Sequence, residues 1–441
     1  MAKVIEQERV NRRPDVLIVG AGPSGLAAAS GLSSTGLSVV IVDQGRQLNL
    51  RYAERSSDLA SGVGGAGLYS DGKFSFYPSA THLWSLQPAG TLSVAYKKTE
   101  KLLATIGMDV PLSPQDARGP VGNAETSLHI KRYPSFYASL EERRHLIKKL
   151  LASSDCQLVL NTKVIRVQRD GMRRLIVEMQ AGGEGRIVAV TPRHLVLAMG
   201  RFGPISLELP GAVTEHVFRR VELGFRIEQS KETFFLRNDP ALDPKLIAKS
   251  GHGAYSWRTF CCCRDGEIVT TQFDRWTTVS GRADCAPTGR SSIGFNLRLE
   301  DAIEAGRVWP LITTLVQAAS AVVREPYGDF MMEGTGRAPG PIAQLFGEGV
   351  SMRLHEGLRR LAGRYGDRAF TDAMLVGPAI EGVGFYPNVS KNLQLGSYPI
   401  WVPGDGAGLF RGITAALVSG FFVSNQIVDA VADSHNEESG K

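Results

Sequence analysis

The chain has 441 residues, of which 43% are hydrophobic and 21% charged, with a formal net charge of +6. This length exceeds one ordinary hydrophobic core, so two domains are expected, and the composition is that of a soluble globular protein. Lysine and arginine are spread along the chain rather than clustered, which argues against nucleic-acid binding. The polar N-terminus does not resemble a signal peptide, and no run of about 18 apolar residues predicts a membrane span, so a cytoplasmic protein without membrane partners is expected.

The first predicted unit is a strand, a glycine turn, a helix and a second strand between Asp15 and Asp43. The apolar run Val16 to Val19 leads into glycines with G-x-G-x-x-G spacing, which are Gly20, Gly22 and Gly25. The first glycine allows the tight turn, the second lets the backbone approach a pyrophosphate, and the third lets helix and strand pack closely.

A helix is expected directly after this turn. Pro23 suits its first turn, and the helix should run to about Thr35, with Gly36 as a left-handed stop. The second strand, Ser38 to Val42, then delivers Asp43, whose carboxylate can accept both hydroxyls of an adenosine ribose. The complete unit predicts a dinucleotide-binding site.

Residues 62–67 repeat the G-x-G-x-x-G spacing, but no buried strand precedes them, so a second nucleotide unit is not expected there. The segment predicts a flexible loop that presents backbone N–H groups to the cofactor. Downstream, residues 86–155 are expected to form a helical insertion that contains the amphipathic stretch Leu140 to Leu151. Strand-like segments separated by turns then follow from Leu158 to Gly200.

Residues 205–369 predict an α+β substrate domain. Alternating runs at Val217 to Ile227 and Glu267 to Phe273 indicate an antiparallel sheet. The later segments Asp301 to Val323 and Val350 to Arg364 are typical of helices.

The five cysteines do not form a recognisable disulfide framework, because three of them are adjacent; they are Cys156, Cys261, Cys262, Cys263 and Cys285. Only His252 lies near enough to join a metal site, so no metal is expected. Neighbouring residues on a strand face opposite ways, so Cys261 and Cys263 should share a face. Buried structural thiols are favoured over a redox role.

Two later segments favour FAD over NAD. Leu195 to Pro204 and Ile400 to Gly408 are apolar strands that end in glycine turns, and the second contains Asp405. FAD is too long for one strand–helix–strand unit, and a carboxylate at a second strand end can bond a ribitol hydroxyl. A helix that begins near Leu409 or Phe410 would point its N-terminus at the flavin and stabilise negative charge there.

Together these three segments resemble the FAD-binding domain of the glutathione-reductase-type flavoproteins. More narrowly, Gly64 to Phe74 (GGAGLYSDGKF) resembles the signature of a bacterial family of NAD(FAD)-utilising dehydrogenases. Asp43 to Arg46, Phe260 to Cys263 and the stretch Gly377 to Pro387 also match that family. The chain departs from it at Arg264-Asp265, where the family usually has Pro-Gly after Cys-x-Cys.

The expected architecture is an α/β protein with a Rossmann-type, glutathione-reductase-like FAD-binding domain and an inserted α+β substrate domain. The FAD-binding domain is expected to be discontinuous, from residues 14–85, 156–204 and 370–432. The residues expected to hold FAD lie at the two glycine segments, the strand ends and one adenine contact: Gly20, Gly22, Pro23, Ser24, Gly25, Asp43, Gln44, Gly45, Arg46, Gly64, Gly65, Ala66, Gly67, Ser70, Asp71, Gly72, Lys73, Val164, Gly200, Asp405, Gly406, Arg411, Gly412, Ile413 and Thr414.

The resemblance implies that residues 64–73 face the flavin ring, where Lys73 could bond N5 or O4 or neutralise a substrate acid. Glu381 and Tyr386 are the candidates for a catalytic base, and His252 and Arg411 are weaker ones. The absence of a second nucleotide unit and of a Cys-x4-Cys pair indicates that electrons come from the substrate, from transiently bound NADH or NADPH, or from a separate partner.

The leading hypothesis is an FAD-dependent dehydrogenase that moves a hydride between a small organic substrate and flavin N5, with FAD held non-covalently. The alternatives are a flavin-dependent monooxygenase and a non-catalytic binding protein that reuses the flavin fold.

Overall fold

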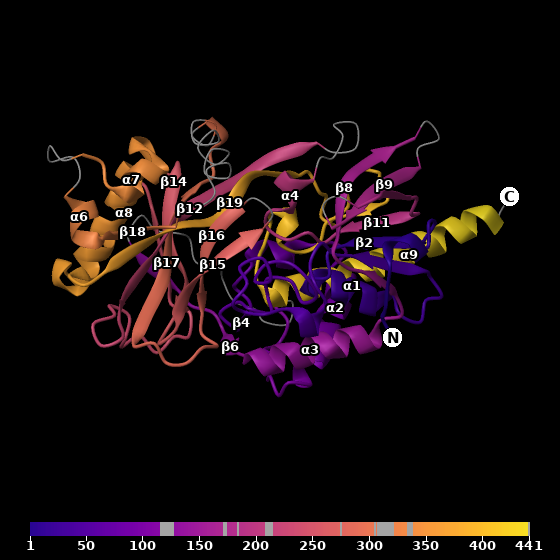
Figure 1. Ribbon diagram of the computed structural model, residues 1–441, viewed down its shortest axis with the longest axis horizontal. Helices are drawn as coiled ribbons and strands as arrows, with labels where there is room; N and C mark the ends of the chain where they lie inside the picture. The colour runs from indigo at the N-terminus through magenta and orange to yellow at the C-terminus, as the bar shows by residue number, and fades with distance from the viewer. Residues whose placement is uncertain are drawn as a thin grey trace.

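The computed structural model describes residues 1–114, 128–170, 174–182, 185–207, 215–273, 276–303, 306, 322–332 and 338–439. Two β-sheets dominate it (Figure 1): a parallel sheet on the side of both termini, and a long antiparallel sheet that carries a group of helices at the opposite end.

The parallel sheet has six strands, and each register-defined pair in it is parallel. The β2 and β3 strands are completely buried apolar runs, as expected for a sheet covered on both faces. In spatial order the strands are β1 (Lys3–Ile5), β7 (Gln157–Val159), β3 (Val39–Val42), β2 (Val16–Val19), β11 (His194–Leu197) and β20 (Ile400–Trp401). This confirms the predicted Rossmann-type fold.

Helices α1 (Pro23–Leu32) and α9 (Ile413–Ser439) pack closely against each other because both carry glycine at the contact. A Cβ on Gly31 would lie 2.0 Å from Ser424 Oγ, and one on Gly420 would lie 2.2 Å from the Ser24 carbonyl oxygen. The first predicted helix ends at Leu32 rather than near Thr35, because Ser34 already has a left-handed φ of 68°.

Three antiparallel strands flank the nucleotide unit: β8 (Thr162–Arg169), β9 (Leu175–Ala181) and β10 (Ile187–Val190). They correspond to the predicted strand-like segments. The insertion contains α2 (Ala89–Ala104) and α3 (Leu140–Ser153), and Ser139 and Glu142 form a capping box at the start of α3.

The second large sheet has seven strands, and its register-defined pairs are antiparallel. In order the strands are β18 (Val323–Pro326), β19 (Met374–Pro387), β12 (His216–Ser230), β17 (Arg290–Leu299), β14 (Tyr255–Cys263), β13 (Lys245–Lys249) and β5 (His129–Lys131). The apolar residues of this sheet share a core with α6 (Tyr327–Met331), α7 (Pro341–Phe346) and α8 (Glu348–Tyr365). The helix predicted over 301–323 lies largely outside the described residues.

Shorter elements complete the chain. The hairpin β15 (Glu267–Phe273) and β16 (Trp276–Arg282) packs beside the seven-stranded sheet, and β4 (Lys73–Ser75) pairs with β6 (Ser135–Tyr137). Helix α4 covers Gly203–Ser206, and 3-10 turns cover Gln7–Arg9, Leu48–Leu50, Thr81–Ser85, Asp367–Phe370 and Gly404–Ala407.

Two predicted domain boundaries differ from this arrangement. The segment 370–432 was expected in the FAD-binding domain, but its β19 portion pairs along its length with β12 of the seven-stranded sheet. The predicted helical insertion likewise contributes β5 to that sheet. In both cases, pairing between strands distant in sequence satisfies the backbone N–H and C=O groups.

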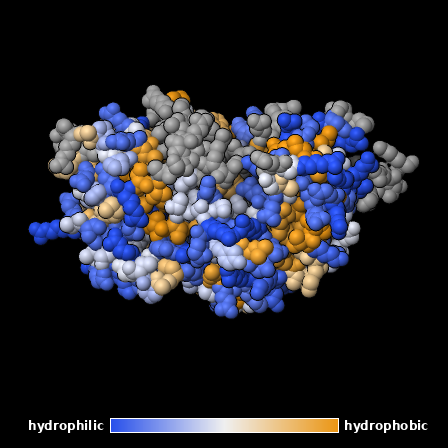
Figure 2. Space-filling view, in the orientation of Figure 1, coloured by the Kyte–Doolittle hydropathy of each residue, from blue (hydrophilic) through white to orange (hydrophobic). Residues whose placement is uncertain are grey.

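Helix α9 is the one described helix that is long and apolar enough to cross a membrane by length and composition, over Ile413–Asp433. Just over half of that window (56%) is buried inside the protein. The face drawn in Figure 2 is largely hydrophilic, with two hydrophobic areas, one over the seven-stranded sheet and one over the nucleotide-binding part.

Candidate functional site

A cavity of about 410 Å³ lies between the two large sheets and is lined by residues of both. One end is formed by the glycine turn after β2 and by the end of β3, and the other by β12, β13, β14, β17 and β19. Segments far apart in the sequence therefore meet around one space, at the carboxyl ends of the parallel strands, where ligands of such sheets usually bind.

Asp43 holds together the loops at the first end of the cavity. Its Oδ2 accepts a hydrogen bond from the Ala21 N–H at 2.7 Å, and its Oδ1 accepts from the Gly45 and Gly62 N–H groups at 2.8 Å each. A carboxylate has about four acceptor sites, so one is left for a ligand hydroxyl. Asp43 thus connects the strand end with both glycine segments.

The second glycine segment packs directly onto the first. The Gly64 N–H donates to the Ala21 carbonyl at 2.8 Å, and a Cβ on Gly65, whose φ is +56°, would lie 2.9 Å from Gly22 Cα. Buried Arg51 supports the segment by donating to the carbonyls of Val63 and Gly65 at 2.6 and 2.9 Å. Burial lowers the pKa of Arg51 to about 10. This supporting role of Arg51 could not be predicted from the sequence, because the residue lies in no recognisable motif.

Most of the residues predicted to hold the cofactor line this cavity: Gly20, Gly22, Pro23, Ser24, Asp43, Gln44, Gly65, Ala66, Gly67, Ser70, Asp71, Lys73, Val164, Gly200, Asp405, Arg411, Gly412 and Ile413. The others are not among its lining residues: Gly25, Gly45, Arg46, Gly64, Gly72, Gly406 and Thr414. Gly25 serves close packing instead, since a Cβ there would lie 2.0 Å from the Gly20 carbonyl oxygen.

Lys73 lies between two carboxylates. Its Nζ is 3.1 Å from Asp71 Oδ2 and 3.4 Å from Asp243 Oδ1, and it also donates to the Cys262 carbonyl. Burial alone would lower the pKa of Lys73, but Asp71 and Asp243 outweigh it, so that the pKa is raised. Lys73 is therefore a cation that neutralises protein carboxylates at this position.

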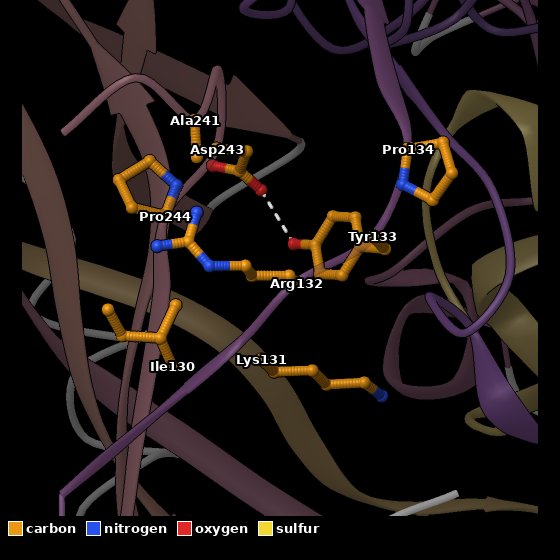
Figure 3. A pocket seen from close by; sticks show the side chains of 8 residues that line it. All are labelled: Ile130, Lys131, Arg132, Tyr133, Pro134, Ala241, Asp243 and Pro244. Carbon is orange, nitrogen blue, oxygen red and sulfur yellow. Dashed lines mark hydrogen bonds between the residues drawn. The ribbon is translucent and has the colours of Figure 1, made fainter. Parts of the chain in front are cut away.

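A second cavity, of about 400 Å³, shares lining residues with the first, and Figure 3 shows the side chains that line it. Tyr133 and Asp243 line both cavities, and the Tyr133 hydroxyl donates to Asp243 Oδ2 at 2.8 Å. Asp243 is thus committed to Lys73, to Tyr133 and to the Cys262 N–H, from which its Oδ1 accepts at 3.1 Å.

Tyr386, predicted as a candidate base, does not line the main cavity. Its side chain is completely buried, and its hydroxyl accepts a hydrogen bond from the Val383 N–H at 2.9 Å. Its ring packs so closely on Gly408 that a Cβ there would lie 2.3 Å away. Chain proximity to Asp405 suggested a place near the flavin, but the pairing of β19 with β12 turns this side chain into the core.

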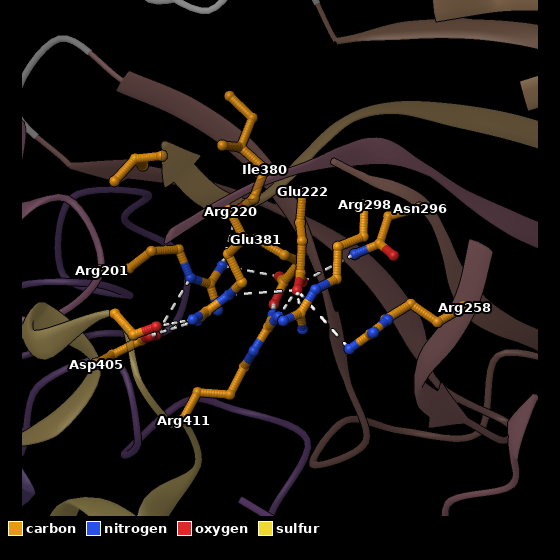
Figure 4. Close-up of polar contacts among 12 residues, drawn as sticks. Arg201, Arg220, Glu222, Arg258, Asn296, Arg298, Ile380, Glu381, Asp405 and Arg411 are labelled. Carbon is orange, nitrogen blue, oxygen red and sulfur yellow. Dashed lines mark hydrogen bonds and ion pairs between the residues drawn. The ribbon is translucent and has the colours of Figure 1, made fainter. Parts of the chain in front are cut away.

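The far end of the cavity is dominated by a group of charged side chains, here called the arginine cluster (Figure 4). It comprises Arg201, Arg220, Arg258, Arg298 and Arg411 around the carboxylates Glu222, Glu381 and Asp405. Arg411, from the loop before α9, ion-pairs with both Glu222 and Glu381. The cluster therefore joins the seven-stranded sheet to the loop that leads into α9.

Glu222 is the buried centre of this cluster, with its side chain completely inaccessible. Arg298 Nη1 lies 3.0 Å and Arg220 Nε 3.3 Å from its Oε1. Burial would raise the pKa of Glu222, but the surrounding guanidinium groups, with Arg411 foremost, hold it well below the usual value. Glu222 could not be predicted because it lies in no motif, and it is one of several charged residues on β12, among them Arg220 and Arg226.

Glu381, the other predicted base, does line the cavity. Its Oε1 is 2.8 Å from Arg201 Nη1, and its Oε2 accepts from Arg411. Each of its oxygens therefore already holds a guanidinium donor.

The residues between the two ends fit FAD. Asp405 Oδ1 and Thr414 Oγ1 are buried but form no hydrogen bond within the described part of the chain. Gly200 (φ +70°) and Gly412 (φ +103°) face open space where a Cβ would meet nothing within 4 Å. The cavity thus offers Asp405 Oδ1, which forms only a long ion pair of 3.8 Å with Arg220 Nη2, and backbone clearance beside the N-terminus of α9, whose first N–H groups favour negative charge.

Cys261 lies on the wall of this cavity at an irregular point of β14. The pairing of β14 with β17 shifts register between Phe260 and Cys263, and Cys261 has a left-handed φ of 49°. This bulge breaks the alternation expected for Cys261 and Cys263. Burial, reinforced by nearby Asp71, raises the pKa of the Cys261 thiol well above its usual value.

Residues 14–233 match the family model described as pyridine nucleotide-disulphide oxidoreductase. Together with the Rossmann-type sheet, this match identifies the class of enzyme. The protein is an FAD-dependent oxidoreductase. No curated protein matches the sequence.

Three of the solved structures that this FAD-dependent oxidoreductase resembles show how distant such similarities are. A flavoprotein/dehydrogenase from Cytophaga hutchinsonii is 13% identical, with 96% of this chain and 79% of that one covered and a TM-score of 0.42. P. aeruginosa PqsL, in complex with 2-aminobenzoylacetate, is 12% identical (96% and 88% covered, TM-score 0.38). Aklavinone-11 hydroxylase, in a ternary complex with FAD and aklavinone, is 11% identical (96% and 64%, TM-score 0.41). Similarity at this level says nothing about the substrate.

Proposed function

We propose that this oxidoreductase is a dehydrogenase that oxidises a small organic substrate with FAD bound in the main cavity. The observation that carries the proposal is the continuity of that cavity. Its lining runs from Asp43 and the glycine turn, past Asp405, to the arginine cluster. A single cofactor molecule extended along it would leave space for a substrate on the side of the seven-stranded sheet.

The residues that would hold FAD follow from the contacts along this lining. Asp43 has acceptor capacity for a ribose hydroxyl, Gly22 and Gly65 allow backbone approach to the pyrophosphate, and Asp405 Oδ1 is available to a ribitol hydroxyl. The N-terminus of α9, at Ile413, would stabilise negative charge on the ring. Bound FAD supplies a hydride acceptor, and no residue with a motif for covalent attachment is required.

The protein side chains at the far end would orient the substrate and hold charge rather than act as nucleophiles. Arg411 and Arg201 hold the Glu381 side chain in place beside the cavity through ion pairs. With FAD bound, the buried ion pairs of Glu222 would limit the access of water to this end of the cavity, which strengthens electrostatic interactions there.

The test is anaerobic. Purified, FAD-loaded protein is mixed with NADH, NADPH and a panel of small organic compounds, and the flavin absorbance near 450 nm is followed. We expect at least one organic compound to bleach the absorbance and to be recovered in oxidised form. A protein that is purified colourless and does not take up FAD would disprove the proposal.

A flavin-dependent monooxygenase is the second candidate, because the same cavity would serve it. The two reactions differ in the fate of oxygen. If labelled O2 is incorporated into the product, the monooxygenase is supported and the dehydrogenase is excluded. A binding protein without redox turnover would show no bleaching with any reductant, even dithionite.

A further inference from the structure

One lysine in the main cavity, Lys245, has no role in the proposed dehydrogenase reaction and no ion-pair partner among the described residues. Lys245, on β13, lines the cavity beside the arginine cluster. Within the described part of the chain, its ammonium group forms neither a hydrogen bond nor an ion pair. Lys245 is partly buried, and a lysine ammonium held in a cavity without a counter-ion is unusual in folded proteins.

Two carboxylates, Glu222 and Asp243, act on the charge of Lys245, and both already have other hydrogen-bond or ion-pair partners. Glu222 is shared among the guanidinium groups of Arg220, Arg258, Arg298 and Arg411. Asp243 is bound by Lys73, Tyr133 and a backbone N–H. Both carboxylates are therefore shared with other donors and offset the charge of Lys245 only in part.

Arg258, on the neighbouring strand β14, is similarly under-satisfied. Its single described ion pair is a long one, with Nη1 3.9 Å from Glu222 Oε1. Its Nε is buried and has no hydrogen-bond acceptor among the described residues. Figure 4 shows Arg258 extending toward Glu222 from the side opposite Arg201.

We propose that Lys245 and Arg258 form the binding site for the carboxylate of an organic acid, and that this acid is the substrate of the enzyme. The substrate assignment depends on the proposed dehydrogenase function, whereas the anion site itself does not. Lys245 has no ion pair among the described residues and Arg258 has only a long one to a shared carboxylate, so these two cations on adjacent strands of one cavity wall favour an external anion.

A carboxylate fits this pair better than a phosphate. Phosphate sites usually draw on backbone N–H groups at helix N-termini or in nests. Here both residues lie in regular strand pairing, with Arg258 opposite Ile247 of β13 and Lys245 opposite Lys131 of β5. The donors are therefore the planar fork of Arg258, which matches a carboxylate, and the single ammonium of Lys245.

The charges around Lys245 make binding at this site dependent on pH. Burial, together with Arg258 and Arg411, lowers the pKa of Lys245 to about 7, although Glu222 and Asp243 raise it in part. Lys131 lies opposite Lys245 on β5 and adds a further cation. A bound carboxylate favours the protonated ammonium, so affinity should fall as the pH rises above neutrality.

The experiment is a calorimetric titration of the FAD-loaded protein with benzoate, a monocarboxylate, and with benzamide, its uncharged counterpart. We expect benzoate to bind, and its dissociation constant to rise by at least about tenfold in Lys245→Met and in Arg258→Met. Lys249→Met, on the same strand but outside the cavity lining, is the matched control and should leave it unchanged. Lys245→Arg should keep the affinity for benzoate, and that affinity should no longer fall as the pH rises above neutrality.

Several outcomes would overturn the site. Benzoate that binds equally to all variants, or no more tightly than benzamide, would show that these cations hold no carboxylate. Inorganic phosphate that competes more strongly than benzoate, and loses affinity in the same variants, would replace the carboxylate with a phosphate. The same titration on FAD-free protein separates the two proposals, because benzoate binding that depends on Lys245 in a protein unable to take up FAD would support the anion site and reject the dehydrogenase.

Discussion

The two ends of the main cavity hold charge in opposite ways. At the glycine end, one carboxylate, Asp43, is satisfied by three backbone N–H groups within hydrogen-bond distance. At the other end, five arginines share three carboxylates, and Lys245 has no ion pair among the described residues. The first end is neutralised by the main chain, whereas the second carries excess positive charge.

This difference separates what each end can recognise. Backbone N–H groups and a single fixed acceptor suit a cofactor that stays bound throughout turnover, because the geometry of these groups is set by the fold itself. A group of side chains with excess positive charge suits an anionic ligand that must enter and leave. The ligand gains binding energy by neutralising charge for which the protein supplies no carboxylate. The predictions that follow test this contrast.

The largest effect is expected from Glu222→Gln. This change keeps the shape of the side chain but leaves Arg411, Arg298 and their neighbours around a neutral amide. Removing one partner of a buried ion pair costs about 3–5 kcal/mol. Urea unfolding at neutral pH should show a loss of this size in the free energy of unfolding.

Glu300→Gln is the control for that change. Glu300 also pairs with Arg298, but its side chain is 48% exposed, so its loss should be close to neutral. Equal stability of Glu222→Gln and the wild type would mean that the arginine cluster does not depend on its buried carboxylate, and the contrast between the two ends would fail.

At the glycine end, Asp43→Asn should weaken FAD binding. The amide cannot accept the three backbone N–H groups as a carboxylate does, and hydrogen bonds to charged groups contribute roughly 1.5–3 kcal/mol. The dissociation constant for FAD, from fluorescence quenching during titration of the apoprotein, should rise roughly ten- to one-hundredfold.

Asp15→Asn provides the comparison within the same structural unit. Asp15 accepts from the Ser38 N–H and hydroxyl at 2.9 and 2.7 Å and does not line the cavity. It should lower stability without changing FAD affinity. Similar FAD affinities for both variants would remove Asp43 from the cofactor site.

The contrast between the two ends also explains what could be predicted from the sequence. The glycine end is built from residues close together in the chain, so the spacing from Gly20 to Asp43 was sufficient to place the strands, the turn and the carboxylate. Glu222, Lys245 and Arg258 instead come from separate strands, and their meeting depends on antiparallel registers that no local pattern encodes.

Local irregularities and long-range pairing of the strands also placed some side chains differently from the prediction. A bulge in β14 broke the alternation assumed for the three cysteines. Long-range pairing drew Tyr386 into the core while leaving Glu381 of the same strand on the cavity. Sequence periodicity predicts which segments are strands, but not which of their side chains reach a common space.

A smaller effect, of the opposite sign to Glu222→Gln, is expected from Lys245→Met. The pKa of Lys245 is lowered to about 7 in the folded protein from 10.5. Below neutral pH, Lys245 is protonated in both the folded and the unfolded protein, so the full cost of burying its charge lowers the stability of the wild type. Between pH 7 and pH 10.5 only the unfolded chain keeps the proton, so the stability of the wild type rises with pH. The variant should therefore be more stable than the wild type, on the order of 1–2 kcal/mol near pH 6.

Thermal unfolding of the apoprotein across pH measures this difference. The gap in melting temperature between Lys245→Met and the wild type should stay constant below about pH 7 and narrow steadily from there to about pH 10.5. A constant gap would show that Lys245 does not carry an uncompensated charge, and would remove the asymmetry between the two ends.

The smallest effect is expected from Cys261→Ser. The thiol lines the cavity, but burial and the nearby carboxylate of Asp71 raise its pKa, so it remains protonated and is a poor nucleophile. Serine keeps the Cβ and hence the backbone conformation at φ 49°. The rate of flavin reduction by substrate, followed by stopped-flow absorbance, should stay within about twofold of the wild type, as should that of the control Cys156→Ser, whose thiol lies outside the cavity lining. A loss of reduction confined to Cys261→Ser would mean that this end of the cavity works through sulfur as well as through charge, and the redox role set aside for the cysteines would have to be restored.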